Sequence, residues 1–432
     1  MKRPVLILGM VPRITTPVAR SLAQHDIPVD VATFSAIEGQ VGSRAIRNFW
    51  RVPDPDISSA AFVEAIQTLI RENHHDMLVP TNDLALSAIV KHYDSFNHLV
   101  HLACPPPEIT SRVLDKNLTL ETARRCGLRI PRTLLVSSPA ELSQLAHNLS
   151  FPIVLKPSEK KSTDDFKTSV IDSPQTLQQR FHASRRFTPP MLVQEFCAGE
   201  GVGVEVLMHA GEPVVAFQHR RLKELPPGGG VAVVALAEAL NTELLYSSVQ
   251  LLRALKWEGV AMVEFKVDAI TGTATLMEVN GRYWGSISLP LLAGFDFPLY
   301  HWALVHGEVP KIPASYRIAT KWRWSAGWIS RWHDLLLDAV RGPVERRRVL
   351  QELKDIPNDF TSSICDALFS AKDPMPGILE CLRVIKDLAM SDVRRVLRLR
   401  RGPRATGTNT EALATLTTNI REAGDAKIDS GS

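Results

Sequence analysis

Residues 260–267, Val-Ala-Met-Val-Glu-Phe-Lys-Val, and residues 275–282, Thr-Leu-Met-Glu-Val-Asn-Gly-Arg, decide the fold of this chain. Both stretches are rich in branched apolar residues, and a Thr271-Gly272 pair stands between them. Glycine supplies the backbone freedom that a tight turn needs, so the arrangement predicts an antiparallel hairpin. Each of the two strands carries an acidic residue, Glu264 on the first and Glu278 on the second.

Side chains alternate along a strand, so Glu278, Asn280 and Arg282 are expected on one face. The neighbouring strand can place Glu264 beside them, which brings three oxygen ligands together. Mg²⁺ prefers hard oxygen ligands and binds through one or two carboxylates plus phosphate oxygens. The alternative interpretation is the solvated polar face of an ordinary hairpin.

The N-terminal region alternates between apolar runs and helical patterns. Val5–Leu8, Val29–Ala32 and Met77–Pro80 are predicted strands with helices between them, which is typical of a doubly wound parallel sheet. Ligands of such sheets gather at the carboxyl ends of the strands, where residues 81–83 fall. Only Gly9 stands where a dinucleotide-binding fingerprint has three glycines, so NAD binding is not supported.

A proline cluster at residues 105–107 marks a domain boundary, because proline cannot continue a helix or pair centrally in a sheet. An α+β unit is expected to follow, with a helix over residues 111–126. Its predicted strands cover residues 133–136, 152–157, near 170, 191–195 and 202–208.

After about Pro313 the chain becomes helical, Arg-rich and rich in tryptophan, and we assign no chemistry to this extension. The tail, with few large apolar residues, is expected to be disordered. The predicted domains are residues 1–108, 109–188, 189–312, 313–401 and 402–432.

Composition restricts the class of protein. A formal charge of +4 over 432 residues is too small to indicate nucleic-acid binding. Five cysteines without a CxxC pair favour a reducing cytoplasm. No apolar run approaches the roughly 20 residues that span a bilayer, so no membrane span is expected. A homodimer is the candidate assembly, because dimers are the commonest oligomers of soluble proteins.

Three further segments carry candidate binding residues. Lys156 ends an apolar strand, and residues 194–197, Gln-Glu-Phe-Cys, end another before the glycine-rich residues 199–203. Arg220 and Arg221 precede a proline- and glycine-rich segment that could close over a substrate. Taken singly, each has an ordinary interpretation: a strand-end lysine, a turn, or a solvated charge run.

In this order, the segments resemble the ATP-grasp superfamily, in particular its carboxylate–amine ligase branch with biotin-carboxylase-like and carbamoyl-phosphate-synthase-like enzymes. The resemblance covers most of residues 1–310. It implies a Rossmann-like pre-ATP-grasp domain, a two-subdomain ATP-grasp fold and a helical C-terminal extension.

The resemblance also implies the role of each site residue. Lys116 and Lys156 would contact the phosphates of ATP, and Gln194, Glu195, Phe196 and Cys197 would form the hinge that binds adenine, with Glu205 near the nucleotide. Glu264, Glu278 and Asn280 would hold two Mg²⁺ ions, for which Mn²⁺ could substitute. Arg282, with Arg220 or Arg221, would bind the acceptor carboxylate or the transferring phosphoryl group.

The implied reaction activates a small-molecule carboxylate as an acyl phosphate for attack by an amine or thiol, releasing ADP and phosphate. One departure concerns the flap, since residues 158–167 contain no glycine where the family has a glycine-rich loop. The alternatives are a bicarbonate-activating, carboxylase-like enzyme and a non-catalytic ATP-binding protein.

Overall fold

The computed structural model describes residues 2–35, 42–145, 149–158, 169–177, 190–227, 229–340, 342–360 and 364–400. The chain divides into two compact units, Met1–Val384 and Ile385–Ser432. Every contact discussed below lies within the first unit. Of the second unit, residues 385–400 form the C-terminal part of helix α14 (Met375–Arg400), and the predicted disordered tail lies outside the described residues.

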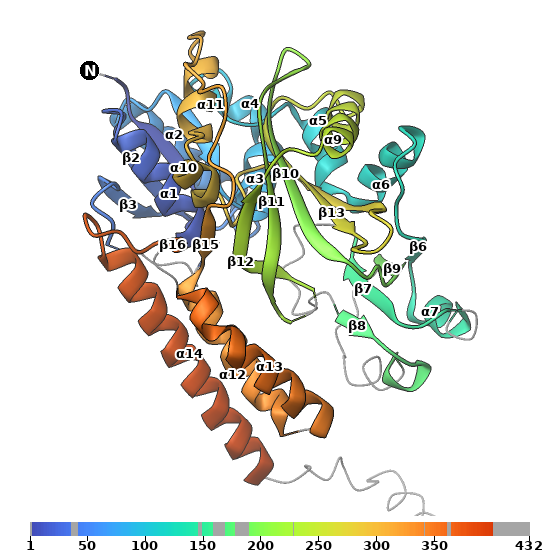
Figure 1. Ribbon diagram of the computed structural model, residues 1–432. Coiled ribbons are helices and arrows are strands. Elements are labelled where there is room, and N and C mark those ends of the chain that lie inside the picture. The colour runs from blue at the N-terminus through green and yellow to red at the C-terminus, as the bar shows by residue number, and fades with distance from the viewer. Residues whose placement is uncertain are drawn as a thin grey trace, which may run out of the picture. The chain divides into compact units, whose positions relative to one another are not determined.

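The N-terminal region is a parallel sheet, as its alternating pattern predicts (Figure 1). Its order is β3-β2-β1-β4-β5, in which every described pairing is parallel. The strands are β1 (Val5–Leu8), β2 (Val29–Thr33), β3 (Asn48–Arg51), β4 (Met77–Pro80) and β5 (His101–Leu102). The helices are α1 (Pro12–Ala23), α2 (Ser59–Glu72), α3 (Asp83–Lys91) and α4 (Tyr93–Phe96).

The apolar run of β1 is continuous because both faces of the strand are covered. Val5 and Ile7 pack with α1 residues such as Val18, whereas Leu6 and Leu8 pack with Phe62 of α2. Strand β3 joins the sheet although it lacks a continuous apolar run; its side chains are half-buried or exposed, as at a sheet edge.

The next region begins with two helices, so the single helix predicted over residues 111–126 is wrong. Helices α5 (Pro107–Leu114) and α6 (Lys116–Arg125) meet at Asp115. The Asp115 carboxylate accepts hydrogen bonds from the backbone N–H groups of Asn117 and Leu118, at 2.8 and 3.1 Å. This is an N-cap, and it makes Lys116 the first residue of a helix.

An antiparallel sheet in the order β6-β9-β7-β8 follows, with its own apolar core. It contains β6 (Thr133–Val136), β7 (Ile153–Pro157), β8 (Ser169–Ile171) and β9 (Met191–Glu195), with α7 (Pro139–Leu145) after β6. These strands lie where the sequence predicts them.

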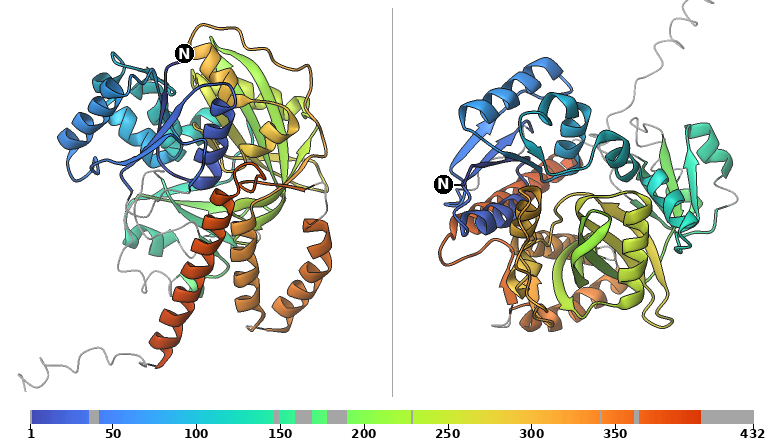
Figure 2. Two further views of the ribbon diagram at one scale, coloured as in Figure 1. Left: turned by 90° about the vertical axis from the view of Figure 1, so that its left-hand side faces the viewer. Right: turned by 90° about the horizontal axis from the view of Figure 1, so that it is seen from above.

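The largest sheet has the order β14-β13-β10-β11-β12-β15-β16. Its strands are β10 (Glu200–His209), β11 (Glu212–Leu225), β12 (Val231–Glu238), β13 (Gly259–Val267), β14 (Ala274–Asn280), β15 (Lys321–Arg323) and β16 (Ile364–Asp366). Helix α9 (Thr242–Ala254) packs on one face, against β10 and β11 (Figures 1 and 2). The predicted hairpin is the β13–β14 pair.

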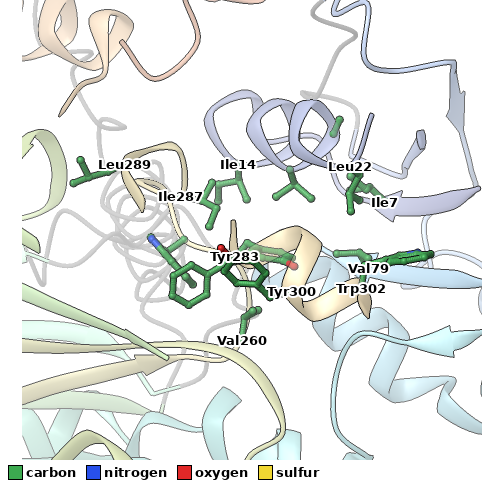
Figure 3. Packing of buried hydrophobic residues seen from close by; sticks show 14 of the residues in the cluster. Ile7, Ile14, Leu22, Val79, Val260, Tyr283, Ile287, Leu289, Tyr300 and Trp302 are labelled. Carbon is green, nitrogen blue, oxygen red and sulfur yellow. The ribbon is translucent and has the colours of Figure 1, made fainter. Parts of the chain in front are cut away.

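The opposite face of this sheet shares a core with the N-terminal region. Val260 of β13 belongs to the same apolar cluster as Ile7 of β1, Ile14 of α1 and Tyr300 (Figure 3). Helices α10 (Ser288–Ala293) and α11 (Phe297–Val305) contribute to this cluster. The shared core brings the carboxyl edge of the parallel sheet toward the acidic hairpin.

The C-terminal part of the first unit contains α12 (Ser325–Ala339), α13 (Pro343–Asp359) and the start of α14. The predicted helical character is confirmed, but β15 and β16, which extend the large sheet, were not predicted. Trp322 of β15 is fully buried and its indole N–H donates to Ser288 Oγ at 2.7 Å. Among the described helices, none is long and apolar enough to cross a membrane.

Candidate active site

Two glutamates and an asparagine converge on the β13–β14 hairpin. Glu264 pairs directly opposite Glu278, and Asn280 follows two residues later on the same face of β14. The Asn280 side-chain amide donates to Glu264 Oε1 at 2.8 Å and to Glu278 Oε1 at 3.1 Å. The structure therefore brings together Glu264, Glu278 and Asn280, the three side chains that strand alternation predicts on one face.

A cation reaches this pair from two strands away. Arg221 of β11 forms an ion pair with Glu264 of β13, although β10 lies between those strands. Its guanidinium also lies 3.7 Å from Glu224 and donates to the Gly230 carbonyl at 2.9 Å. Burial lowers the pKa of Arg221, but Glu264 and Glu224 outweigh that effect and hold its pKa above the ordinary value. Arg221 is therefore a permanent cation beside the carboxylates.

Two glycines of β10, Gly201 and Gly203, leave space for the side chains of Arg221 and His219. A Cβ added to Gly201 would come within 2.9 Å of Arg221 Cδ and 2.8 Å of a Glu224 oxygen. A Cβ added to Gly203 would come within 2.5 Å of the His219 ring. Of the glycine-rich residues 199–203, Gly201 and Gly203 therefore lie within β10 and make room for side chains that cross the strand.

We expect the substitution Gly201→Ala to lower the free energy of unfolding by about 1–3 kcal/mol, the usual cost of overpacking a tight site. Arg221 or Glu224 must move to admit the methyl group. Gly229→Ala is the matched control, because an added Cβ there meets nothing within 4 Å. Chemical denaturation of both variants measures the difference, and equal stability of the two would contradict the close packing described for Gly201.

Arg282 connects the hairpin to the N-terminal sheet. It follows β14, and its guanidinium donates to Asp83 Oδ2 at 2.9 Å and to the Tyr283 carbonyl at 3.0 Å. Burial lowers the pKa of Arg282, but Asp83 and then Glu278 outweigh it and hold the pKa above its ordinary value. Asp83 begins α3, three residues after the last residue of β4, at the sheet edge where the sequence places ligand-binding residues.

Arg13 is a site residue that was not predicted from the sequence. It lies in the first turn of α1, and its guanidinium carbon stands 4.1 Å from the ring centre of Trp324. Burial lowers the pKa of Arg13 to about 10, and the neighbouring cations Arg282 and Arg221 act in the same direction. The signal that could have found it is its position after β1 and Gly9, at the carboxyl edge of a parallel strand.

These residues line one cavity of about 620 Å³. Its charged and amide-bearing walls are Arg13, Lys116, Arg221, Glu264, Glu278, Asn280 and Arg282. Apolar side chains, among them Ile14, Leu225, Val231 and Met262, form other parts of the lining. Lys116 enters from the start of α6, where its ammonium donates to the Pro157 carbonyl at 3.3 Å. The cavity thus combines several cations with two carboxylates in a partly apolar space.

Arg220 does not line this cavity. Alternation along β11 turns it to the opposite face from Arg221, where it donates to Glu238 at 2.6 Å and to Glu200 at 3.0 Å. The hydrogen bond to Glu238 raises the pKa of Arg220. Of the two arginines that the sequence left as alternatives, the structure brings only Arg221 to the carboxylates.

Glu205 also lies apart from the cavity lining. Its carboxylate is fully buried and lies 2.5 Å from His219 Nδ1. Burial raises the pKa of Glu205 despite the opposing effect of His219. This buried pair gives Glu205 a structural role in the sheet.

The remaining nucleotide-binding candidates lie on β7, β9 and the residues after β9. Lys156 is buried on β7, and Gln194 is buried on β9, where its amide donates to Thr133 Oγ1 at 2.8 Å. Glu195 ends β9 with an exposed side chain, and Phe196 is exposed by 37%. Burial raises the pKa of the Cys197 thiol. None of these side chains lines the cavity described above. Of the predicted flap at residues 158–167, all but Ser158 lie outside the described residues.

The carboxylate pair fits a divalent cation in its chemistry. Two glutamate carboxylates accept hydrogen bonds from the same amide nitrogen, so their negative charge is concentrated in a small volume. Within the part of the chain that the structure describes, no group of three or more His, Cys, Asp or Glu side chains is arranged so that it could hold a metal ion. A site with two carboxylates suits Mg²⁺, which completes its coordination with phosphate oxygens and water.

Comparison with known proteins gives a consistent assignment for this region. Residues 187–325 match a family model described as ATP-grasp in the biosynthetic pathway with Ter operon. A D-alanine–D-alanine ligase of Paracidovorax citrulli (strain AAC00-1) is 26% identical over 181 residues, which are 39% of this chain and 53% of that protein. The chain thus spans about half the length of this curated relative.

Solved structures share the fold over a longer part of the chain. An L-amino acid ligase from Bacillus licheniformis aligns with a TM-score of 0.56 and 18% identity, covering 70% of this chain and 73% of its own. The biotin carboxylase from Campylobacter jejuni aligns with a TM-score of 0.58 and 13% identity, covering 74% of each chain. The parallel N-terminal sheet, the antiparallel sheets and these matches together show that the chain has the ATP-grasp fold, and the ATP-grasp family model matches its residues 187–325.

Proposed function

We propose that this protein is an ATP- and Mg²⁺-dependent ligase that activates a carboxylate as an acyl phosphate for attack by an amine, or by a thiol. The observation that carries the proposal is the cavity in which Glu264 and Glu278 face Arg221, Arg282 and Lys116. Carboxylates for metal binding and cations for phosphate binding are the two groups that phosphoryl transfer from ATP requires.

In this proposal, Glu264, Glu278 and Asn280 hold Mg²⁺, with Mn²⁺ as a substitute. Bound there, the metal supplies neutralisation of charge on the phosphates of ATP. Lys116 and Lys156 bind phosphate oxygens, and residues 194–197 bind the adenine. Glu205 and Arg220 are not included, because both are engaged in ion pairs elsewhere in the sheet.

The chain's own residues then act on the substrate carboxylate. A carboxylate is a poor electrophile, since its negative charge repels nucleophiles and its oxygen is a poor leaving group. Arg282 and Arg221 bind and orient it so that one oxygen attacks the γ-phosphorus while the bond from that phosphorus to the bridging oxygen of ADP breaks. Their fixed positions, set by Asp83 and Glu264, provide electrostatic stabilisation without reorganisation during the reaction.

An amine then attacks the carbonyl carbon of the acyl phosphate, and phosphate leaves with the electron pair of the broken carbon–oxygen bond. The cavity walls must exclude water at this stage, because water would hydrolyse the acyl phosphate. The apolar side chains that share the lining with the cations favour this exclusion.

Calorimetric titration of the full chain with a non-hydrolysable ATP analogue, with and without Mg²⁺, tests the proposal. We expect binding that depends on Mg²⁺, followed by ADP release from ATP in a screen of acids paired with amines. An arm with bicarbonate and no amine tests the carboxylase-like alternative. Absence of nucleotide binding would overturn the ligase proposal, whereas binding without ADP release on any acid would favour a non-catalytic ATP-binding protein.

A further inference from the structure

Arg13 differs from the other arginines of the cavity in its partners. Arg282 is paired with Asp83 and Arg221 with Glu264, but within the described residues no ion pair joins Arg13 to a carboxylate. Its guanidinium lies over the Trp324 ring and against the backbone of Gly285, where an added Cβ would come 2.9 Å from Arg13 Cζ. A half-buried charge without an ion-pair partner is poorly solvated, and an anion that enters the cavity would complete it.

The wall behind Arg13 comes from the C-terminal helices. Trp324 precedes α12, and its indole N–H donates to Glu380 Oε2 of α14 at 2.9 Å. Glu380 is buried, and burial raises its pKa although Trp324 and Arg13 act in the opposite direction. Among the described side chains, no ion pair joins Glu380 to Arg13, and the Arg13 guanidinium lines the cavity.

Arg13 also stands apart from the metal-binding end of the cavity. The printed contacts of the Arg13 guanidinium are with Trp324 and Gly285, whereas Arg221 forms its ion pair with Glu264. In the proposed reaction, the carboxylate that is phosphorylated lies beside the glutamates, near the γ-phosphate. Arg13 is then available to bind a second group of the substrate.

We propose that Arg13 binds a second anionic group of the acid substrate, so that the enzyme selects acids with two anionic groups, a dicarboxylate or a phosphorylated acid. This inference rests on the proposed ligase function. The planar guanidinium fork suits bidentate binding of either oxyanion, and the Trp324 stack fixes its plane. The helical C-terminal extension thereby contributes to substrate selection through Trp324 and Glu380.

The test is calorimetric binding of matched acids to the full chain in the presence of Mg²⁺ and the ATP analogue. The dicarboxylates succinate, glutarate and adipate are each compared with their monoamides, and 3-phosphopropionate-type acids with their phosphate-free counterparts. We expect the dianionic member of at least one pair to bind about tenfold or more tightly than its partner, equivalent to about 1.4 kcal/mol. The two series distinguish a carboxylate from a phosphate as the second group.

Three variants assign the preference to Arg13. Arg13→Gln should abolish it while Mg²⁺-dependent nucleotide binding persists, and Arg13→Lys should retain part of it. Arg20→Gln removes the same charge from the same helix, at a side chain paired with Asp373, and should leave the preference intact.

Two results would overturn the inference: equal binding of both members of every pair by the wild type, or a preference that survives Arg13→Gln. Absence of nucleotide binding by the wild type is a separate result and counts against the ligase function. The acid titrations repeated without nucleotide would then still decide whether Arg13 binds a dianion.

Discussion

Replacement of Glu278 with glutamine is expected to lower the rate of ADP release by a factor of about 10² to 10³, the usual effect of removing one preorganised electrostatic group from an active site. Glutamine keeps the shape of the side chain, and its carbonyl oxygen can still accept the hydrogen bond that Asn280 donates at 3.1 Å. The change therefore removes one negative charge and little else. Calorimetric titration should show in parallel that nucleotide binding loses its dependence on Mg²⁺.

Glu243→Gln provides the matched control for this charge change. Glu243 is an exposed residue in the first turn of α9, outside the cavity, so its substitution removes one carboxylate without altering the site. Both variants should unfold at temperatures close to that of the wild type. Unchanged Mg²⁺-dependent binding and ADP release in Glu278→Gln would show that the carboxylate pair is not the metal site.

Replacement of Arg221 with glutamine is expected to lower the free energy of unfolding by about 3–5 kcal/mol. The Arg221 and Glu264 side chains are exposed by only 11% and 14%, so loss of the guanidinium leaves Glu264 as a poorly solvated charge. Glu224, whose side chain is 9% exposed, has two cationic neighbours; it loses Arg221 and keeps Lys266. Denaturant titration followed by tryptophan fluorescence measures the change.

The neighbouring residue supplies the control for Arg221. Arg220→Gln removes a cation that is 30% exposed from pairs with Glu200 and Glu238, and solvent-exposed pairs of this kind contribute about 0–1 kcal/mol. A double variant, Arg221→Gln with Glu264→Gln, should be less destabilised than the two single changes predict together, by about 2–3 kcal/mol. Equal destabilisation by the Arg220 and Arg221 substitutions would contradict the assignment of Arg221 as the buried partner.

The acidic hairpin could be predicted because its information is local. A short turn and strict alternation determine which residues of β13 and β14 share a face, so Glu264, Glu278 and Asn280 could be aligned from their spacing alone. The same holds for the parallel sheet, whose continuous apolar runs reflect burial on both faces. The start of helix α6 was misplaced because its capping residue, Asp115, stands inside an otherwise continuous helical pattern.

The choice between Arg220 and Arg221 could not be made from the sequence. Adjacent residues point to opposite faces, but which face holds the glutamates depends on the pairing of β10 with β13, two strands that lie far apart in the sequence, and on the irregular register between Leu207 and Met208 in the β10–β11 hairpin. The space that Gly201 and Gly203 leave for side chains of β11 could not be predicted either, because it also depends on how the strands pair. A glycine that clears space for a side chain of the next strand looks, in sequence, like a glycine in a loop.

The sequence by itself determined the parallel N-terminal sheet, the acidic hairpin and the order of its candidate ligands, because these depend on periodicity and short-range spacing. The ATP-grasp fold was implied by the resemblance of the ordered segments to that superfamily. Only the tertiary structure decided that Arg13 lines one cavity with the hairpin residues, that Asp83 pairs with Arg282 and that Trp324 stacks on Arg13. These residues come from the N-terminal region and from the C-terminal extension, and they converge because a shared apolar core buries both sheets together. Burial of apolar surface depends on the whole chain and leaves no signature in the spacing of any single polar residue.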